Sequence, residues 1–277
     1  MLIELATGKL TSSTYHDATL ARVLSGELAH FEDHPQWCSA LSAIKTHSWS
    51  AFKQKKQCGG SIDTAVLLVR HPFAAIWSEF QREMAQRSSG GDGGAKTGCG
   101  SSRSCATDRN PHGTGSSLTR VPAEWADAAR ALARQYVLLH TPKAQRGEGG
   151  VECTGACASY TPSQWYGEAV GAARAVSYAD WRDDATKRST YLYFEELIDA
   201  DKRYAALGRA LRFARADASA ERVACAFEMS DIASVHRAAS SGLTAREAFA
   251  AVPDVADAVW AEVAATATAL GYTRDGY

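Results

Sequence analysis

The clearest hydrophobic pattern in the chain is a continuous apolar run at 65–69, which ends in Arg70 and passes at once into a segment with helical periodicity. The run is short, aliphatic and without polar alternation, which predicts a strand buried on both faces of a parallel sheet. Pro72 suits the first turn of a helix, because the N–H that proline lacks has no partner there. The apolar residues that follow fall on one face of this helix: Phe73, Ile76, Trp77, Phe80 and Met84.

Arg70 is therefore expected at the carboxyl end of a strand, where ligands bind in open α/β sheets. Its guanidinium offers a planar fork of donors to phosphate or sulfate, and the start of the next helix adds oriented N–H groups. Ser78 and Arg82 follow four residues apart on another side of the helix. The pattern predicts an anion site; a solvated boundary arginine is the alternative interpretation.

The rest of the chain predicts helices separated by short strands, which is typical of the α/β class. Strands are expected at 42–47 and 191–194, and helices at 2–6, 122–140, 161–181, 195–212, 219–230, 244–251 and 254–270. Two segments, near 88–119 and 141–160, are expected to be disordered surface insertions, and the first is crowded with glycine. We expect a single domain over 1–277.

Composition narrows the classes of partner. The chain has 277 residues, of which 45% are hydrophobic, and a net charge of −1, as expected for one globular core. A pI near 6.7 argues against a broad basic face, so no nucleic-acid partner is expected. No apolar run approaches the roughly 20 residues that cross a bilayer. Taken alone, the chain is expected to be soluble.

Seven cysteines are an odd number, so they cannot all pair within one chain. The close pairs are Cys99/Cys105 and Cys153/Cys157, and both lie in loop-like segments. Small disulfide rings or free thiols are the favoured interpretations. A zinc site is less favoured, because the spacing of the two pairs is not that of a structural zinc site; no metal is expected.

Four segments resemble, in the same order, sulfotransferases that use 3′-phosphoadenosine 5′-phosphosulfate (PAPS). Ala43-Ile44-Lys45-Thr46-His47 is similar to the Lys-Thr-His strand end of that superfamily, and the strand, Arg70, proline and Ser78 resemble its 3′-phosphate-binding strand and helix. Residues 190–197 resemble a later strand with its acidic turn. Residues 2–17 look like one branch in particular, the WSC-domain-containing sulfotransferase-like proteins.

The resemblance implies a P-loop-NTPase-like parallel sheet flanked by helices. In that family the helix matching residues 2–6 follows a central strand and a Pro-x-x-Gly-Asn-Thr-Trp loop that cradles the 5′-phosphosulfate, and neither is found in this sequence. We therefore expect an N-terminally incomplete domain that lacks its first central strand. The resembled branch consists of Golgi membrane proteins whose anchor lies N-terminal to the catalytic domain, so any membrane contact is expected through that anchor.

The resemblance also implies roles for individual residues. It places His47 as the base that takes the acceptor's proton and Lys45 near the donor or acceptor. Arg70 and Ser78 would hold the 3′-phosphate. Phe194 matches a position near the adenine, with plain core packing as an equal alternative, and Arg237 is the candidate of a basic loop that closes over the 3′-phosphate.

The expected function is sulfuryl transfer from PAPS, as co-substrate, to a hydroxyl acceptor such as a glycan. A histidine suits the proton acceptor, because its ordinary pKa near 6.5 leaves it largely neutral at neutral pH. The alternative is a catalytically inactive fragment or degenerate relative that binds the nucleotide without transfer. A P-loop kinase is disfavoured, because the sequence holds no Gly-Lys-Ser/Thr motif after a glycine-rich loop.

Overall fold

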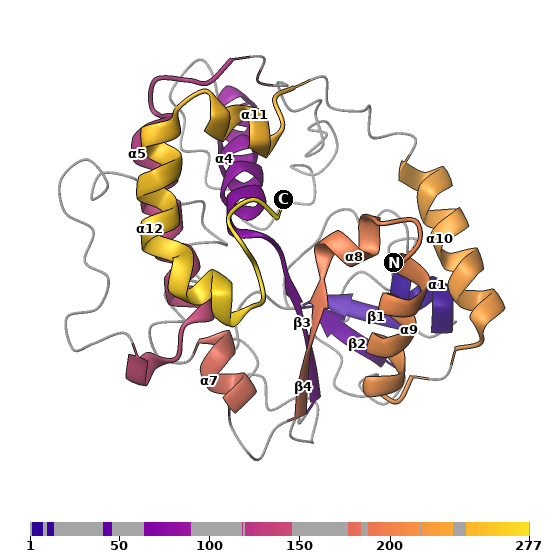
Figure 1. Ribbon diagram of the computed structural model, residues 1–277. Helices are drawn as coiled ribbons and strands as arrows, with labels where there is room; N and C mark the ends of the chain where they lie inside the picture. The colour runs from indigo at the N-terminus through magenta and orange to yellow at the C-terminus, as the bar shows by residue number, and fades with distance from the viewer. Residues whose placement is uncertain are drawn as a thin grey trace, which may run out of the picture.

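The computed structural model describes ten stretches of the chain: 2–7, 10–13, 41–45, 64–89, 118, 120–145, 177–183, 188–216, 218–234 and 242–276. Two parallel strands lie at the centre of the arrangement, β3 (Thr64–Val69) and β4 (Arg188–Tyr193). Their register runs from Thr64 opposite Arg188 to Val69 opposite Tyr193, so both strands end at the same level (Figure 1).

Helices α4 (Pro72–Ser89), α5 (Trp125–His140), α11 (Ala245–Ala250) and α12 (Pro253–Ala269) pack on one side of this strand pair. Their shared core is built on aromatic rings. Trp125 is fully buried and packs against Trp77 and Phe249, with ring centroids 4.8 and 5.1 Å apart. Phe73 stacks on Phe249 at 4.2 Å. The first turn of α4, directly after the strand, is thus fixed by packing.

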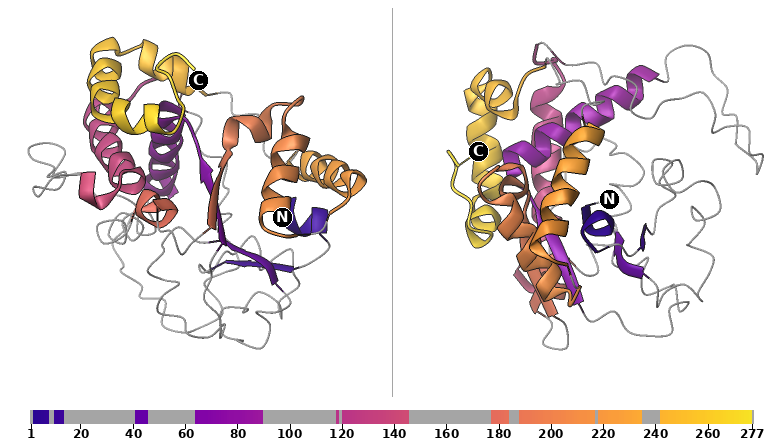
Figure 2. Two further views of the ribbon diagram at one scale, coloured as in Figure 1. Left: turned by 60° about the horizontal axis from the view of Figure 1, so that its bottom comes forward. Right: turned by 90° about the vertical axis from the view of Figure 1, so that its right-hand side faces the viewer.

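The other side of the strand pair carries α8 (Phe194–Ile198), α9 (Arg203–Phe213), α10 (Ala220–Ser234) and α1 (Leu2–Thr7). Leu192 of β4 packs on Ala206 and Ala210 of α9. A second small core joins α1 to α9 and α10 around Leu207 and Phe227. The left view in Figure 2 keeps the same order, with helices, strand pair and helices in sequence across the molecule.

Strands β1 (Leu10–Ser13) and β2 (Leu41–Lys45) form a second parallel pair. Within the described residues, the two pairs are separate sheets and no ladder joins them. Short helices η5 (Lys143–Gln145) and α7 (Tyr178–Asp183) complete the described elements. The structure is therefore a mixed, helix-dominated arrangement with small parallel sheets, compatible with the expected α/β class; one continuous P-loop-like sheet stays a prediction.

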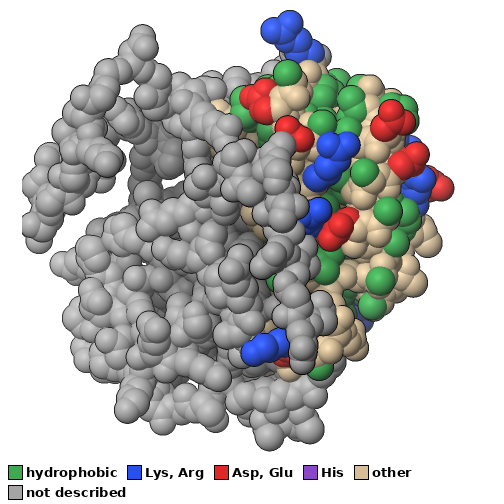
Figure 3. Space-filling view, turned by 90° about the vertical axis from the view of Figure 1, so that its left-hand side faces the viewer, with side chains coloured by type: hydrophobic (Ala, Val, Ile, Leu, Met, Phe, Trp, Pro, Cys, Tyr) green, Lys and Arg blue, Asp and Glu red, His purple; other side chains and the backbone are tan. Residues whose placement is uncertain are grey.

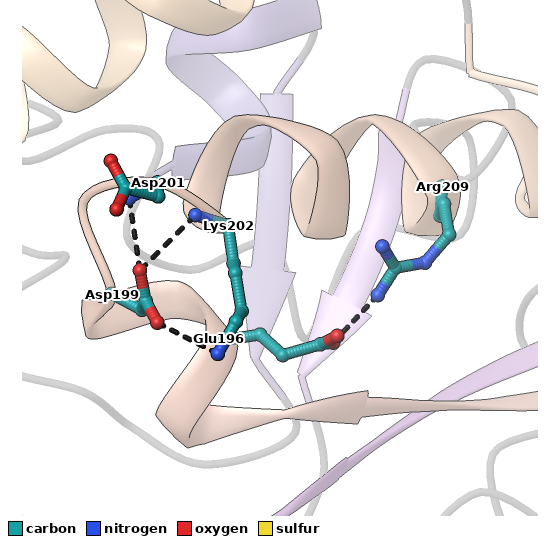
Figure 4. A network of polar contacts seen from close by, with 5 residues as sticks. All are labelled: Glu196, Asp199, Asp201, Lys202 and Arg209. Carbon is teal, nitrogen blue, oxygen red and sulfur yellow. Dashed lines mark hydrogen bonds and ion pairs between the residues drawn. The ribbon is translucent and has the colours of Figure 1, made fainter.

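The boundary between β4 and its helix was placed wrongly by the sequence pattern. The strand begins at Arg188 and ends at Tyr193, and Phe194 already opens α8. The single helix expected over 195–212 is broken in two, because the Asp199 carboxylate accepts the N–H groups of Asp201 and Lys202 and so fixes a turn (Figure 4). Ion pairs from Asp199 to Lys202 and from Glu196 to Arg209 brace the turn.

Several expected segments fall partly or wholly outside the described residues. The expected helix 161–181 is described only from 177 onward, and the two expected insertions only at their ends. At one of those ends the Leu118 carbonyl accepts the Leu243 N–H at 2.8 Å, and Leu118 packs on the aromatic core. The helix expected over 244–251 is confirmed as α11, and Thr244 and Glu247 form a capping box at its start with both reciprocal bonds present.

The surface over α5 and α12 carries both signs of charge. Figure 3 shows Lys, Arg, Asp and Glu side chains interspersed with apolar ones on this face. Arg134 of α5 lies 4.0 Å from the Glu262 carboxylate of α12, and both groups are partly exposed. No helix among the described segments is long and apolar enough to cross a membrane.

Candidate functional site

Arg70 and Phe194 leave the sheet side by side at the carboxyl ends of β3 and β4. Because Val69 pairs with Tyr193 in the last step of the ladder, the next residue of each strand emerges at the same point. The guanidinium carbon of Arg70 lies 4.5 Å from the centroid of the Phe194 ring. The ring therefore gives the cation a flat aromatic support.

The Arg70 guanidinium makes no hydrogen bond or ion pair with any described residue. Its Nε is buried and has no partner. Burial lowers the pKa of Arg70, and the charge of Glu195 opposes that shift. Arginine keeps its proton at all ordinary pH values, so the site holds a positive charge whose hydrogen-bond donors are not taken up by any described residue. Such a group is suited to an anion that brings oxygen acceptors.

A side chain of α5 holds the backbone of Arg70 by a hydrogen bond. The hydroxyl of Tyr136, which is 3% exposed, donates to the Arg70 carbonyl at 3.0 Å. Burial raises the pKa of Tyr136 far above its ordinary value, so the hydroxyl keeps its proton and remains a donor. The strand end is therefore anchored in the aromatic core, while the Arg70 side chain forms no hydrogen bond with the part of the chain that the structure describes.

Glu195 lies beside Arg70 but binds two other groups. Its Oε1 accepts the backbone N–H of His71 at 2.8 Å, and its Oε2 accepts the hydroxyl of Tyr272 at 3.0 Å. Burial, followed by the charge of Glu195, raises the pKa of Tyr272 far above its ordinary value. The carboxylate thus joins the end of β3, the start of α8 and the segment after α12.

His71 is fully buried, and both its ring nitrogens have partners. Nδ1 accepts the N–H of Phe73 at 3.2 Å, so Nε2 carries the proton and donates to the Thr273 carbonyl at 2.9 Å. Burial lowers the pKa of His71, which favours this neutral form. With both nitrogens engaged, His71 holds the backbone and has no lone pair free to act as a base.

Ser78, the expected partner of Arg70, lies in the second turn of α4 with an exposed side chain. Arg70 and Ser78 form no hydrogen bond with each other, so the structure places them on the same strand–helix unit without joining them. On the same helix Arg82 donates from Nε to the nearly buried Glu79 at 2.9 Å. Arg82 is thereby engaged in an ion pair within α4.

The remaining expected site residues are only partly described. Lys45 is the last residue of β2, with its Cα opposite that of Ser13. His47 and Arg237 lie outside the described residues. Within the described stretches, no group of three or more His, Cys, Asp or Glu side chains is arranged to hold a metal ion.

Sequence reasoning missed the roles of Tyr136, Glu195 and Tyr272. Tyr136 was expected only as part of an apolar helix face, and Glu195 only as part of an acidic turn. A signal for Tyr272 does exist in the sequence: Gly271 after the last apolar position of a helix predicts a reversal of the chain. The position to which that reversal brings the tyrosine depends on tertiary structure.

No family model matches this chain, and no solved structure matches it either.

Proposed function

We propose that this protein binds a sulfated or phosphorylated adenosine nucleotide at the ends of β3 and β4 and acts as a PAPS-dependent sulfotransferase. The observation that carries the proposal is the unpaired guanidinium of Arg70 over the Phe194 ring. A phosphate oxygen would supply the acceptors that this cation lacks, and the aromatic ring offers an apolar surface to a base. PAPS is proposed as the nucleotide because the segments around Lys45, Arg70 and Glu195 resemble those of the sulfotransferases.

In this proposal the parallel sheet is P-loop-NTPase-like, and Arg70 and Ser78 hold the 3′-phosphate. Phe194 lies near the adenine, and Arg237 closes over the phosphate. The acceptor is a hydroxyl group, such as that of a glycan. Its oxygen attacks the sulfur in line, the bond from sulfur to the 5′-phosphate oxygen breaks, and 3′-phosphoadenosine 5′-phosphate (PAP) leaves. His47 takes the hydroxyl proton and Lys45 stabilises the transferring group.

A binding experiment tests the nucleotide site. Titration calorimetry with PAP should give an affinity that falls about tenfold to a hundredfold in Arg70→Ala, because charge-assisted hydrogen bonds are lost. Arg188→Ala is a matched control. Arg188 stands at the other end of β4 and also stacks on an aromatic ring, that of Phe213 at 5.0 Å. Equal affinity of wild type and Arg70→Ala for PAP would remove the proposal.

A second candidate function is nucleotide binding without transfer. It rests on Arg70 and Phe194 alone, which can hold an anionic nucleotide without a base; the histidine next to Arg70, His71, has both ring nitrogens engaged. Transfer of labelled sulfate from PAPS to a mixture of glycans distinguishes the two candidates. Transfer that is lost in His47→Ala, with PAP binding retained, supports the sulfotransferase; binding without any transfer supports the second candidate.

A further inference from the structure

Arg70 has an acidic neighbour with which it does not pair. Glu195 follows Phe194, whose ring lies under the Arg70 guanidinium, and the Glu195 charge is close enough to favour the charged form of Arg70. A partly buried arginine and a nearby carboxylate ordinarily form a bidentate ion pair. Here the described residues show no such bond, and the buried Nε of Arg70 has no partner.

The reason lies in the two donors that hold the Glu195 carboxylate. One is the backbone N–H of His71, at 2.8 Å, which cannot lose its proton. The other is the Tyr272 hydroxyl, at 3.0 Å, which stays protonated in this environment because burial raises its pKa. Each oxygen of the carboxylate therefore already accepts a hydrogen bond from a neutral donor.

Tyr272 is itself fixed by the end of α12. Gly271 has a φ of +84°, a left-handed conformation that glycine adopts without strain, and it turns the chain back so that the Tyr272 N–H donates to Ala267 at 2.9 Å. The Tyr272 ring then packs edge-on against His71 and Tyr193, with centroids 5.3 and 5.8 Å apart. The hydroxyl is thus positioned by both the backbone and the core.

We infer that Tyr272 is a positioning residue that holds Glu195 away from Arg70 and so keeps the guanidinium available to the anion. This inference rests on the proposed nucleotide site. It adds that the segment after α12 controls whether Arg70 is available in that site. Without the hydroxyl, Oε2 of Glu195 would lack the Tyr272 donor and would turn to the neighbouring guanidinium of Arg70, which no described residue hydrogen-bonds. An incoming phosphate would then have to displace a carboxylate.

The test measures PAP affinity by calorimetry in Tyr272→Phe, which keeps the ring and removes the hydroxyl. We expect binding about tenfold weaker than wild type. Adding Glu195→Gln to this variant should restore the affinity to within about twofold, because the competing charge is gone. Tyr204→Phe is the control: this α9 hydroxyl is also engaged in a hydrogen bond, which it accepts from Arg203 at 3.1 Å. Unchanged affinity in Tyr272→Phe, or no rescue by Glu195→Gln, would overturn the inference.

Glu195→Gln alone provides a variant that does not depend on the folding of Tyr272→Phe. A glutamine can still accept the His71 N–H and contact the Tyr272 hydroxyl, so the fold should be kept. PAP binding should be at least as tight as in wild type. Weaker binding by a folded Glu195→Gln protein would contradict the idea that the carboxylate competes with the ligand.

A stability measurement separates this inference from the proposed function, because it needs no nucleotide. Urea unfolding of Arg70→Gln, Glu195→Gln and the double variant gives the coupling between the two side chains. We expect Arg70 and Glu195 to stabilise each other more strongly in the Tyr272→Phe background than in the wild-type background. The difference should correspond to a factor of about five in the folding equilibrium constant. If the coupling appears while wild type binds no PAP, the nucleotide proposal fails and the positioning role stands. Equal coupling in both backgrounds would overturn the positioning role.

Discussion

Val69 of β3 lies opposite Tyr193 of β4 in the last pair of the parallel ladder. This pairing decides which side chains meet where the strands end, since Arg70 and Phe194 follow directly and stack at 4.5 Å. A shift of one residue in the register would turn every side chain of one strand to the other face. The candidate site therefore depends on the register between β3 and β4 as well as on the identity of Arg70 and Phe194.

The first prediction concerns the aromatic support of Arg70. Phe194→Leu removes a cation–π contact of about 1 kcal/mol, so PAP should bind about fivefold more weakly by calorimetry. Phe194→Tyr keeps the ring and should stay within about twofold of wild type. Phe213→Leu, which removes the ring under Arg188 at 5.0 Å, is the control and should bind like wild type. A similar loss in Phe194→Tyr would contradict a role for the ring face.

The second prediction concerns the anchor of the strand end. Tyr136→Phe removes the hydroxyl that donates to the Arg70 carbonyl, so the free energy of unfolding should fall by about 1–2 kcal/mol. Urea unfolding measures this change. Tyr204, which is 38% exposed, is the control, and Tyr204→Phe should change stability by less than about 0.5 kcal/mol. An equal effect of the two substitutions would show that the hydrogen bond from Tyr136 to the Arg70 carbonyl does not stabilise the folded protein.

The third prediction compares two glycines. Gly271 has a φ of +84°, so Gly271→Ala should destabilise the protein by about 1–2 kcal/mol. Gly208 lies inside α9, where an added Cβ would meet only the flexible end of Arg212 at 3.4 Å. Gly208→Ala should therefore stabilise by about 0.5–1 kcal/mol. Thermal or urea unfolding measures the change in stability for both variants. An unchanged free energy of unfolding in Gly271→Ala would argue against the left-handed turn that positions Tyr272.

The fourth prediction is a loss of stability in acid. Burial lowers the pKa of His140 to about 4, whereas an unfolded histidine has a pKa near 6.5. Between these values the unfolded chain binds a proton that the folded protein does not, so the free energy of unfolding decreases as the pH falls. Part of the side chain reaches solvent, so we expect a loss of about 1–2 kcal/mol between pH 7 and 5.

His140→Leu should remove most of this pH dependence, as measured by urea unfolding at the two pH values. A smaller slope of the same sign should remain, because burial also lowers the pKa of His71. A variant that loses as much stability as wild type would show that another group carries the effect.

Local patterns were enough to predict the elements next to the site. The apolar run before Arg70 and the proline after it predicted β3 and α4, and the helix expected over 244–251 is present as α11. These features depend on neighbours within a few residues, which a sequence displays directly. The break at Asp199 was missed, because an Asp side chain that caps a turn looks the same in sequence as one on a helix surface.

The site itself was only partly predictable. Arg70 could be placed at the end of a strand, but the partners of Glu195 come from β3 and from the segment after α12, far away in the sequence. No periodicity indicates that Tyr272 will meet Glu195, since that contact follows from the packing of α12 on α5. Charge alone would have predicted a salt bridge between Arg70 and Glu195, which the described residues do not form.

The bond from His71 Nε2 to the Thr273 carbonyl joins residues 202 positions apart, and this separation bears on biosynthesis. On the ribosome, β3, β4 and α8 are all made before residues 271–273, so the strand pair can assemble while Glu195 still lacks its second donor. At that stage the nascent chain is free to form an Arg70–Glu195 ion pair. The Tyr272 hydroxyl can reach Glu195 only once the C-terminal residues have left the ribosome, so on our inference the release of the guanidinium from its acidic neighbour is among the last steps of folding.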